Sequence, residues 1–298
     1  MKRFFILASA AIVALASCAK TEVVSNNEPQ EIAFKQLAGP MTKAEALKTD
    51  MGVFAYTADG SKYFGPVQFI NKDGVWKGNP SQYYPLQTAL DFACYSPCDG
   101  FNNWSYDNTN QTLTSPVFAD VKAVDVLYGE KIYADCSKKS SPVSVLFKHA
   151  LAQVSVKVSS NVPAAITVNS VTLKGLCTGG KVTVDYDKDA WNKTTWGEKV
   201  PNADYLWTKQ DDFTLTDTAA EFGAPIFFVP GDSDTAVNQT SFVVSYTMNE
   251  VTMTATVTLN GIWEMGKHYI YTLKADLNEI TFAPEVQLMD VVETELTL

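Results

Sequence analysis

Short runs of alternating apolar and polar residues recur along almost the whole chain, and this pattern constrains the fold more than any other feature. The runs Ala152–Ser159 (AQVSVKVS), Ala165–Leu173 (AITVNSVTL), Ser241–Met248 and Val251–Leu259 all alternate in this way. Because successive side chains of a strand point to opposite faces, a period of two is typical of half-buried β-strands. No long stretch shows the period of an α-helix. The pattern therefore predicts an all-β protein.

Turn-forming residues separate these runs. Asn249-Glu250 fills a two-residue gap between two alternating runs, which predicts a β-hairpin, and Asn260-Gly261 closes the second run. Strands separated by Gly, Asn, Asp and Pro turns favour stacked antiparallel sheets over a parallel α/β sheet. The polar stretch Cys136–Pro142 (CSKKSSP) precedes a new series of runs. We therefore expect two β-sandwich domains, at residues 31–142 and 143–298.

The first residues have the features of an export signal. A short basic start (MKR) precedes an apolar run from Phe4 to Ala16, which is too short for a membrane-spanning helix of about 20 residues. The run leads into Ala16-Ser17-Cys18, which resembles a bacterial lipobox, whose cysteine is acylated. An ordinary secretory signal with a chance cysteine is the alternative. The first interpretation assigns residues 1–17 to a lipoprotein signal peptide, Cys18 to lipid attachment and residues 18–30 to a flexible tether.

The charge of the chain narrows the range of partners. Without Lys2 and Arg3 of the expected signal peptide, 21 basic residues face 33 acidic ones, which gives a net charge of −12. Nucleic-acid binding needs a basic surface, so this charge argues against it. No later run reaches membrane-spanning length, which leaves the lipid on Cys18 as the expected membrane contact. The remaining cysteines are expected to be buried thiols or to form a disulfide; they are Cys94, Cys98, Cys136 and Cys177.

The sequence contains no pattern typical of an enzyme or a metal site. Its two histidines, His149 and His268, lie on separate β segments, and no nucleophile elbow, P-loop or HExxH pattern occurs. Residues 185–196 open with the aspartate spacing of a calcium loop. However, Ala190 stands where that loop needs a glycine, and Trp196 stands where it needs a glutamate. We therefore expect no catalytic residue, no metal and no cofactor.

Aromatic residues gather in residues 186–207, among polar neighbours. If their rings were exposed, Trp191, Trp196 and Trp207 would offer flat contact surfaces to a glycan or a protein partner. The alternative is that these rings pack a long loop onto its own sandwich. The second interpretation is favoured, because buried aromatic residues are ordinary in β domains.

Four features, spread in order along the chain, form a recognisable set. The lipobox cysteine Cys18 precedes a polar tether, and the tether leads to Glu31-Ile32-Ala33-Phe34 and then to Met41-Thr42-Lys43-Ala44. The third feature is Phe147–Val154 (FKHALAQV), and the fourth is Trp263–Tyr271 (WEMGKHYIY) followed by Glu279–Phe282. Together they resemble the entry, central and closing segments of the fimbrillin family of Bacteroidales, which comprises type V pilins with their anchor and tip proteins.

The resemblance implies two transthyretin-like β-sandwiches on an outer-membrane lipoprotein. In polymerising members a protease removes the N-terminal strand, and a terminal strand of the next subunit fills the groove that is left. Here the removable strand corresponds to about Glu31–Gln36. The only arginine is Arg3, so the resemblance places the cut at Lys43, or else implies an uncut anchor or tip.

The donor strand implied by the resemblance lies in Glu285–Thr297, with Val286, Leu288, Val291 and Leu296 as its apolar residues. A last strand paired within its own domain is the alternative. Together these observations predict a structural subunit of a cell-surface fimbria, a pilin or adhesin, with other fimbrial subunits as partners. A lipid-anchored module that binds a host glycan or protein is the second hypothesis.

Overall fold

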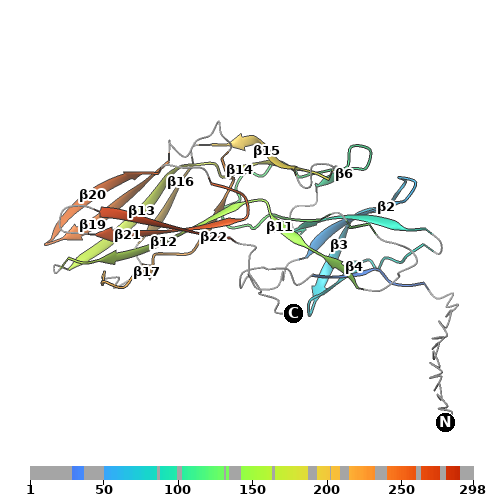
Figure 1. The fold of residues 1–298 in the computed structure, drawn as a ribbon, viewed down its shortest axis with the longest axis horizontal. Coiled ribbons are helices and arrows are strands. Elements are labelled where there is room, and N and C mark those ends of the chain that lie inside the picture. The colour runs from blue at the N-terminus through green and yellow to red at the C-terminus, as the bar shows by residue number, and fades with distance from the viewer. Residues whose placement is uncertain are drawn as a thin grey trace, which may run out of the picture.

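The computed structural model describes 22 β-strands and no helix within residues 29–36, 50–85, 88–98, 103–130, 132–133, 142–162, 165–186, 193–201, 203–208, 215–231, 240–259, 263–275 and 280–288. The all-β class predicted from the alternating pattern is confirmed. Within this part of the chain, no helix is long and apolar enough to cross a membrane. The sheets form two groups along the long axis of the molecule (Figure 1).

The first group is built on a nine-stranded sheet whose two ends are joined by one short segment. The sheet has the order β10-β1-β4-β3-β2-β5-β8-β11, and β9 also pairs with β5. Only Leu146 separates β10 from β11, so residues 143–149 pair with β1 on one side and with β8 on the other. The sheet is thereby closed into a barrel-like ring. Its strands are β1 (Ala33–Gln36), β2 (Met51–Thr57), β3 (Lys62–Lys72), β4 (Val75–Asn79), β5 (Leu90–Ser96), β8 (Leu127–Gly129), β9 (Ile132–Tyr133), β10 (Val143–Val145) and β11 (Phe147–His149).

Strands β2, β5 and β8 are buried on both faces. Inside the ring they contribute Val53, Phe92 and Leu127 to a core of mainly aromatic and aliphatic side chains. Their other face, with Phe54 and Tyr95, packs against a second sheet of order β15-β14-β7-β6. Burial on both faces explains why these strands are nearly continuous apolar runs in the sequence. The second sheet consists of β6 (Ser105–Asp107), β7 (Thr112–Thr114), β14 (Gly179–Asp185) and β15 (Lys193–Val200).

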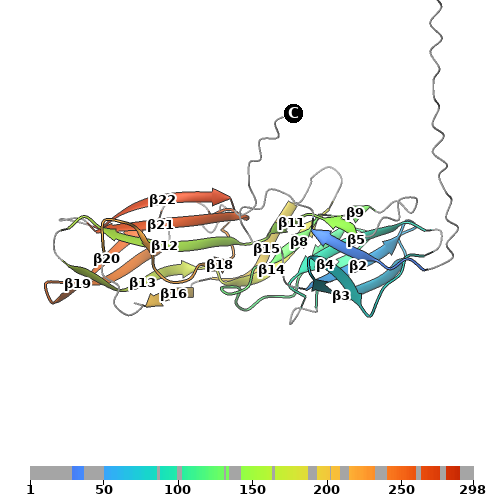
Figure 2. The ribbon, with the colours of Figure 1, turned by 90° about the horizontal axis from the view of Figure 1, so that it is seen from below.

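The second group is a sandwich of two sheets (Figure 2). One has the order β17-β12-β21-β22, with β18 also paired to β12, and the other has the order β16-β13-β19-β20. Alternate residues of both sheets, such as Val154, Val156 and Phe242, fill the core between them. The strands are β12 (Ala152–Ser160), β13 (Ile166–Leu176), β16 (Ala203–Thr208), β17 (Ala220–Glu221), β18 (Ile226–Phe228), β19 (Ser241–Met248), β20 (Val251–Thr258), β21 (Lys267–Ala275) and β22 (Ile280–Leu288).

The sequence suggested a domain boundary at residue 143, but the chain is still part of the first sheet at this position. Strands β10 and β11, after that position, complete the first sheet. The β14–β15 hairpin crosses back as well, because β14 pairs with β7 through Val184 and Leu113. Residues 143–149 and strands β14 and β15 therefore pair with the N-terminal sheets, although the sequence pattern suggested that they lie in the C-terminal domain. The chain passes into the second sandwich between β11 and β12, at Ala150 and Leu151.

Candidate functional site

Strand β1 occupies a slot between two other strands of the first sheet. It runs antiparallel to β4, with Phe34 opposite Trp76, and parallel to β10, with Phe34 opposite Val143. Both backbone edges of this short strand are therefore paired. A strand in this position holds the ring closed, because no other described strand joins β4 to β10.

The inward side chains of β1 are large and fully buried. Ile32 and Phe34 are both 0% exposed. The ring of Phe34 meets the edges of Phe69 and Phe92, with ring centroids 5.1 Å away in each case. Full burial of one such side chain contributes about 1.5–3 kcal/mol relative to leaving it in water. The two side chains therefore stabilise β1 in its slot in addition to its backbone bonds.

A polar cluster fixes the start of the strand. The Glu31 carboxylate accepts bonds from the Lys77 ammonium at 2.7 Å and the Ser81 hydroxyl at 2.8 Å. These bonds hold the pKa of the Glu31 carboxyl below its usual value. The backbone N–H of Ile32 donates to the carbonyl of Gln82 at 2.7 Å. The cluster sets the register of β1 in its slot, because it anchors the residue just before Ile32.

The slot defines what any other strand would need in order to replace β1. The replacement must pair with β4 and β10 and must place two apolar side chains, two residues apart, in the space of Ile32 and Phe34. An acidic residue directly before the first of them would meet Lys77. Without an occupant, two strand edges and an apolar interior would face water.

Two of the site residues expected from the sequence lie outside the described residues. These are Cys18, the expected lipid attachment site, and Lys43, the expected cut site. Lys43 falls in the segment between Gln36, the last residue of β1, and Asp50, which directly precedes β2.

The expected donor residues are divided between β22 and the residues that follow it. Val286 lies opposite Tyr269 and Leu288 lies opposite Lys267 in the antiparallel pair β21–β22. Residues 280–288 thus form a strand of their own sandwich, in agreement with the alternative given for this segment. Val291 and Leu296 lie outside the described residues.

Two of the three tryptophans considered as ligand contacts are buried. The indole N–H of Trp196 donates to the carbonyl of Ala150 at 2.7 Å, and that of Trp207 donates to the carbonyl of Ala224 at 2.8 Å. Trp196 is 9% exposed and Trp207 is 3% exposed. Neither ring presents a face to a ligand, so the structure agrees with packing for both. Trp191 lies outside the described residues.

The two histidines do not come together. His149 bonds to the Asp125 carboxylate through Nδ1, at 2.8–2.9 Å, at the end of β11. His268 lies on the second sandwich, where its Nε2 is 2.7 Å from the Ser155 hydroxyl. Burial holds the pKa of His268 below its usual value. Each histidine therefore bonds to its own partner, His149 to Asp125 and His268 to Ser155, in a different part of the molecule.

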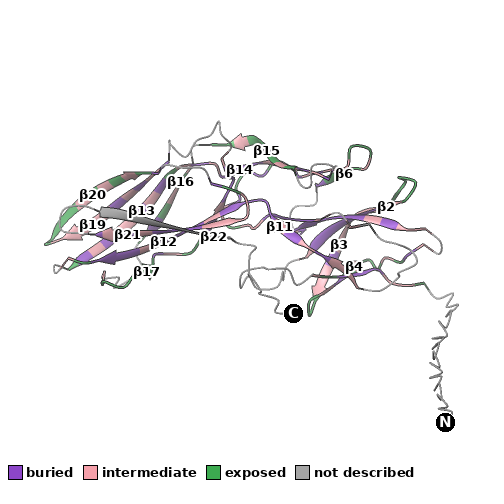
Figure 3. Ribbon diagram, viewed as in Figure 1, coloured by how far each residue is buried: buried purple, intermediate pink, exposed green. Residues whose placement is uncertain are grey.

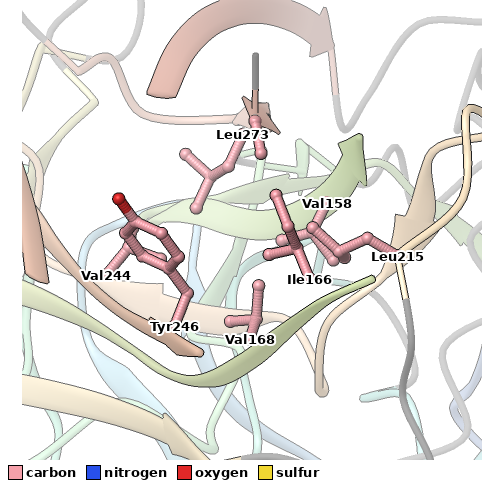
Figure 4. Close-up of a pocket in the computed structure, with 8 residues that line it drawn as sticks. Val158, Ile166, Val168, Leu215, Val244, Tyr246 and Leu273 are labelled. Atoms are coloured by element: carbon pink, nitrogen blue, oxygen red, sulfur yellow. The ribbon is translucent and has the colours of Figure 1, made fainter. Parts of the chain in front are cut away.

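Two observations describe the potential ligand sites in the part of the chain that the structure describes. Within it, no group of three His, Cys, Asp or Glu side chains could hold a metal ion. A pocket at one end of the second sandwich is lined by apolar side chains, with the Tyr246 hydroxyl as the polar group nearby (Figure 4). Ligand sites usually combine an apolar lining with several convergent polar groups, and this pocket lacks them.

Sequence reasoning did not find the segment that completes the slot. Residues 143–149 carry β10 and β11, yet only one residue separates the two. The alternation of apolar and polar residues is the same whether a run pairs with one strand or changes its partner halfway, so the pattern cannot reveal the change. The one signal in the sequence was the short length of the run Val143–Phe147, which ends before Ala150.

Comparison with known proteins identifies the fold and the family. A model of the fimbrillin-like family matches residues 41–287. No curated protein sequence matches the chain. Similar solved structures include a candidate cell adhesion protein of Bacteroides uniformis, with a TM-score of 0.58 and 13% identity over 88% of this chain and 98% of that one.

Two further structures share the fold at low identity. A fimbrial protein of Bacteroides vulgatus has a TM-score of 0.57 and 16% identity, over 87% of this chain and 99% of that one. A candidate cell adhesion protein of Bacteroides ovatus has a TM-score of 0.53 and 18% identity, over 90% and 99%. The family match spans most of the chain, which confirms the resemblance seen in the sequence. The chain belongs to the fimbrillin-like family.

Proposed function

We propose that this chain is a structural subunit of a cell-surface fimbria and that it assembles by exchange of strand β1. Membership of the fimbrillin-like family supports a fimbrial or cell adhesion role at the cell surface, with other fimbrial subunits as partners. It groups the chain with structural proteins rather than with known enzymes. The observation that carries the proposal is the position of β1, which is paired on both edges and buries Ile32 and Phe34 completely.

Removal of β1 would create a site for a second subunit. The vacated slot would keep the edges of β4 and β10 and the cavity left by Ile32 and Phe34. Both edges would offer unpaired backbone groups, and the cavity would expose Phe69 and Phe92 to water. A strand from another copy can satisfy all of these groups at once, which makes strand addition the favourable outcome.

The donor that fits best is the segment Glu295-Leu296-Thr297-Leu298. It repeats the acidic–apolar–small–apolar pattern of Glu31-Ile32-Ala33-Phe34. Leu296 and Leu298 would replace Ile32 and Phe34, and Glu295 would meet Lys77. In an extended strand Val291 would point to the opposite face from Leu296. Glu285–Leu288 has a similar pattern, but its pairing with β21 would first have to break.

Export and processing complete the proposal. Acylated Cys18 attaches the precursor to the outer membrane. A cut after Lys43 then separates residues up to Lys43, including β1, from the rest of the subunit. The mature chain would begin at Ala44 and would keep β4 and β10 to receive the donor strand.

The test is the N-terminal sequence of protein from native cells, together with gels of unboiled and boiled samples. We expect a start at Ala44 and a ladder of oligomers that boiling converts to monomer. Lys43→Gln should remove both the new N-terminus and the ladder. Lys48→Gln, in the same segment, is the matched control and should leave both unchanged. Monomer in unboiled samples of cut protein would refute strand exchange.

A further inference from the structure

Strand β20 ends its sheet with a free backbone edge. All eight of its residues pair in regular register with β19, from Val251 opposite Met248 to Thr258 opposite Ser241. In the part of the chain that the structure describes, no strand pairs with its other edge. Its threonines, Thr252, Thr254, Thr256 and Thr258, are exposed. Figure 3 shows exposed stretches along β20. The edge is therefore long, regularly paired on its inner side and accessible.

The hairpin turn determines which backbone groups face outward. Asn249 and Glu250 both have positive φ, 51° and 65°, as in a two-residue type I′ turn. In such a hairpin Met248 and Val251 exchange hydrogen bonds, and bonded pairs then alternate along the ladder. The bond from the Leu259 N–H to the Thr240 carbonyl, 3.0 Å, continues the same alternation. The N–H and C=O groups of the four threonines therefore point to the free edge.

The other long strands at the ends of sheets carry features that discourage further pairing. Strand β15 bears Lys193, Glu198 and Lys199, and its register shifts. Strand β22 contains Pro284, and β16 contains Asp204 and pairs through a register shift. Charges, proline and irregularities of this kind protect sheet edges from association. Strand β20 (VTMTATVT) has none of them.

We propose that β20 pairs in antiparallel fashion with β20 of a second copy of this chain. One register uses all of the outward groups: Thr252 lies opposite Thr258 of the second copy, Thr254 lies opposite its Thr256, and Ala255 lies on the two-fold axis. Each threonine pair exchanges two backbone hydrogen bonds, so about eight bonds form. The two four-stranded sheets become one continuous sheet.

Charge and side-chain character favour a second copy as the occupant. The chain carries a formal net charge of −10, but β20 contains no charged residue, so two copies can approach here without local repulsion. Threonine pairs across an antiparallel ladder are favourable. On the inner face, the half-buried Met253 would meet Val257 of the second copy, and Ala255 would meet its own counterpart. The surface is thus complementary to itself, as a two-fold interface requires.

The proposal is tested by sedimentation of chains that carry Lys43→Gln, which keeps β1 in its slot. Because Lys43→Gln prevents strand exchange, any dimer of this variant must form in another way. The experiment can therefore refute pairing at β20 without refuting strand exchange, and the reverse also holds. We expect a reversible dimer that boiling or mild denaturant dissociates. T254K/T256K places lysine opposite lysine in the proposed register and should raise the dimer Kd at least 10-fold. T254K/T256E places lysine opposite glutamate and should stay dimeric.

A mixture of two disrupted variants supplies the remaining check. T254K/T256K mixed with T254E/T256E should form mixed dimers, although each variant alone is monomeric. Both substituted positions, 254 and 256, are exposed, so the melting temperatures should match that of the parent chain. A parent chain that is monomeric at every concentration would overturn the proposal, as would a dimer that is insensitive to T254K/T256K. If T254K/T256E is monomeric, residue 254 does not lie opposite residue 256 of the second copy, and the proposed register is wrong.

Discussion

The backbone N–H of Gly266 donates to the carbonyl oxygen of Leu151 at 2.9 Å. This bond joins the two segments that carried the family resemblance, because Leu151 lies in Phe147–Val154 and Gly266 lies in Trp263–Tyr271. The pairing continues as the parallel ladder β12–β21, from Gln153 opposite His268 onward. The two segments thus meet where the chain leaves the first sheet, which gives both a structural role.

Gly266→Ala should lower the free energy of unfolding by about 1–2 kcal/mol, because the backbone of Gly266 is left-handed, with φ of 70°. Gly266→Asn should cost less, since asparagine tolerates this conformation better. The measurement is urea unfolding. Gly197→Ala is the matched control: an added Cβ meets nothing within 4 Å there, so stability should not fall. Equal losses for Gly266→Ala and Gly197→Ala would contradict the role given to the backbone at Gly266.

Phe34→Ala should destabilise the uncut chain by about 3–5 kcal/mol, because it removes a fully buried ring from the core of the closed sheet. Lys35→Ala, at the exposed neighbouring position, should change stability by less than about 0.5 kcal/mol. In protein cut after Lys43, the same Phe34→Ala change should speed the release of the cleaved segment that ends at Lys43 and contains β1, measured by mass spectrometry over time. Equal release rates for the two variants would argue against Phe34 as the anchor.

Local patterns were sufficient to predict several strands of the second sandwich, among them β12, β13, β19 and β20. The alternation in residues 241–259 and the intervening Asn249-Glu250 predicted a hairpin, and β19 and β20 form it in register. The information is local, since it depends only on which residues alternate and which favour a tight turn. Burial of Trp196 and Trp207 was favoured on a general ground, namely that aromatic rings usually fill the cores of β domains.

Pairing between distant segments was not accessible to the same reasoning. Nothing in the run at residues 143–149 shows that it bridges β1 and β8, and nothing in residues 179–185 shows that β14 pairs with β7. Such choices depend on which edges remain free after the other strands have paired. The slot around β1 was therefore expected only through the family resemblance, and the pairing of β10 with β1, which forms the second wall of the slot, was not expected.

The stability of the folded chain should fall as the pH drops below about 6.5, the ordinary pKa of histidine, in part because of His268. Burial lowers the pKa of His268 in the folded state, with Glu221 opposing and Lys157 adding to this shift. The folded state thus binds this proton less readily than the unfolded state. The contribution of neutral His268 to stability is fully present above the pKa that this histidine has in the unfolded chain. It is lost as the pH falls through the lower pKa that His268 has in the folded chain. Urea unfolding between about pH 7 and 5 should show a shallower decline for His268→Gln.

Leu296→Asp should prevent a subunit from donating residues 295–298 without affecting its ability to receive a donor strand. The change puts a charge into the apolar slot now filled by Ile32, where burial of an unpaired charge is strongly unfavourable. Thr294→Asp introduces the same charge at the position that corresponds to Gln30, which precedes the buried residues and is only partly buried, and it is the matched control. Co-expression with the parent chain should shorten the oligomers seen on unboiled gels for Leu296→Asp much more than for Thr294→Asp. Full-length ladders with Leu296→Asp as the only subunit would rule out this donor. Shortening by both variants alike would show that charge near the end of the sequence matters, rather than the register on Ile32 and Phe34.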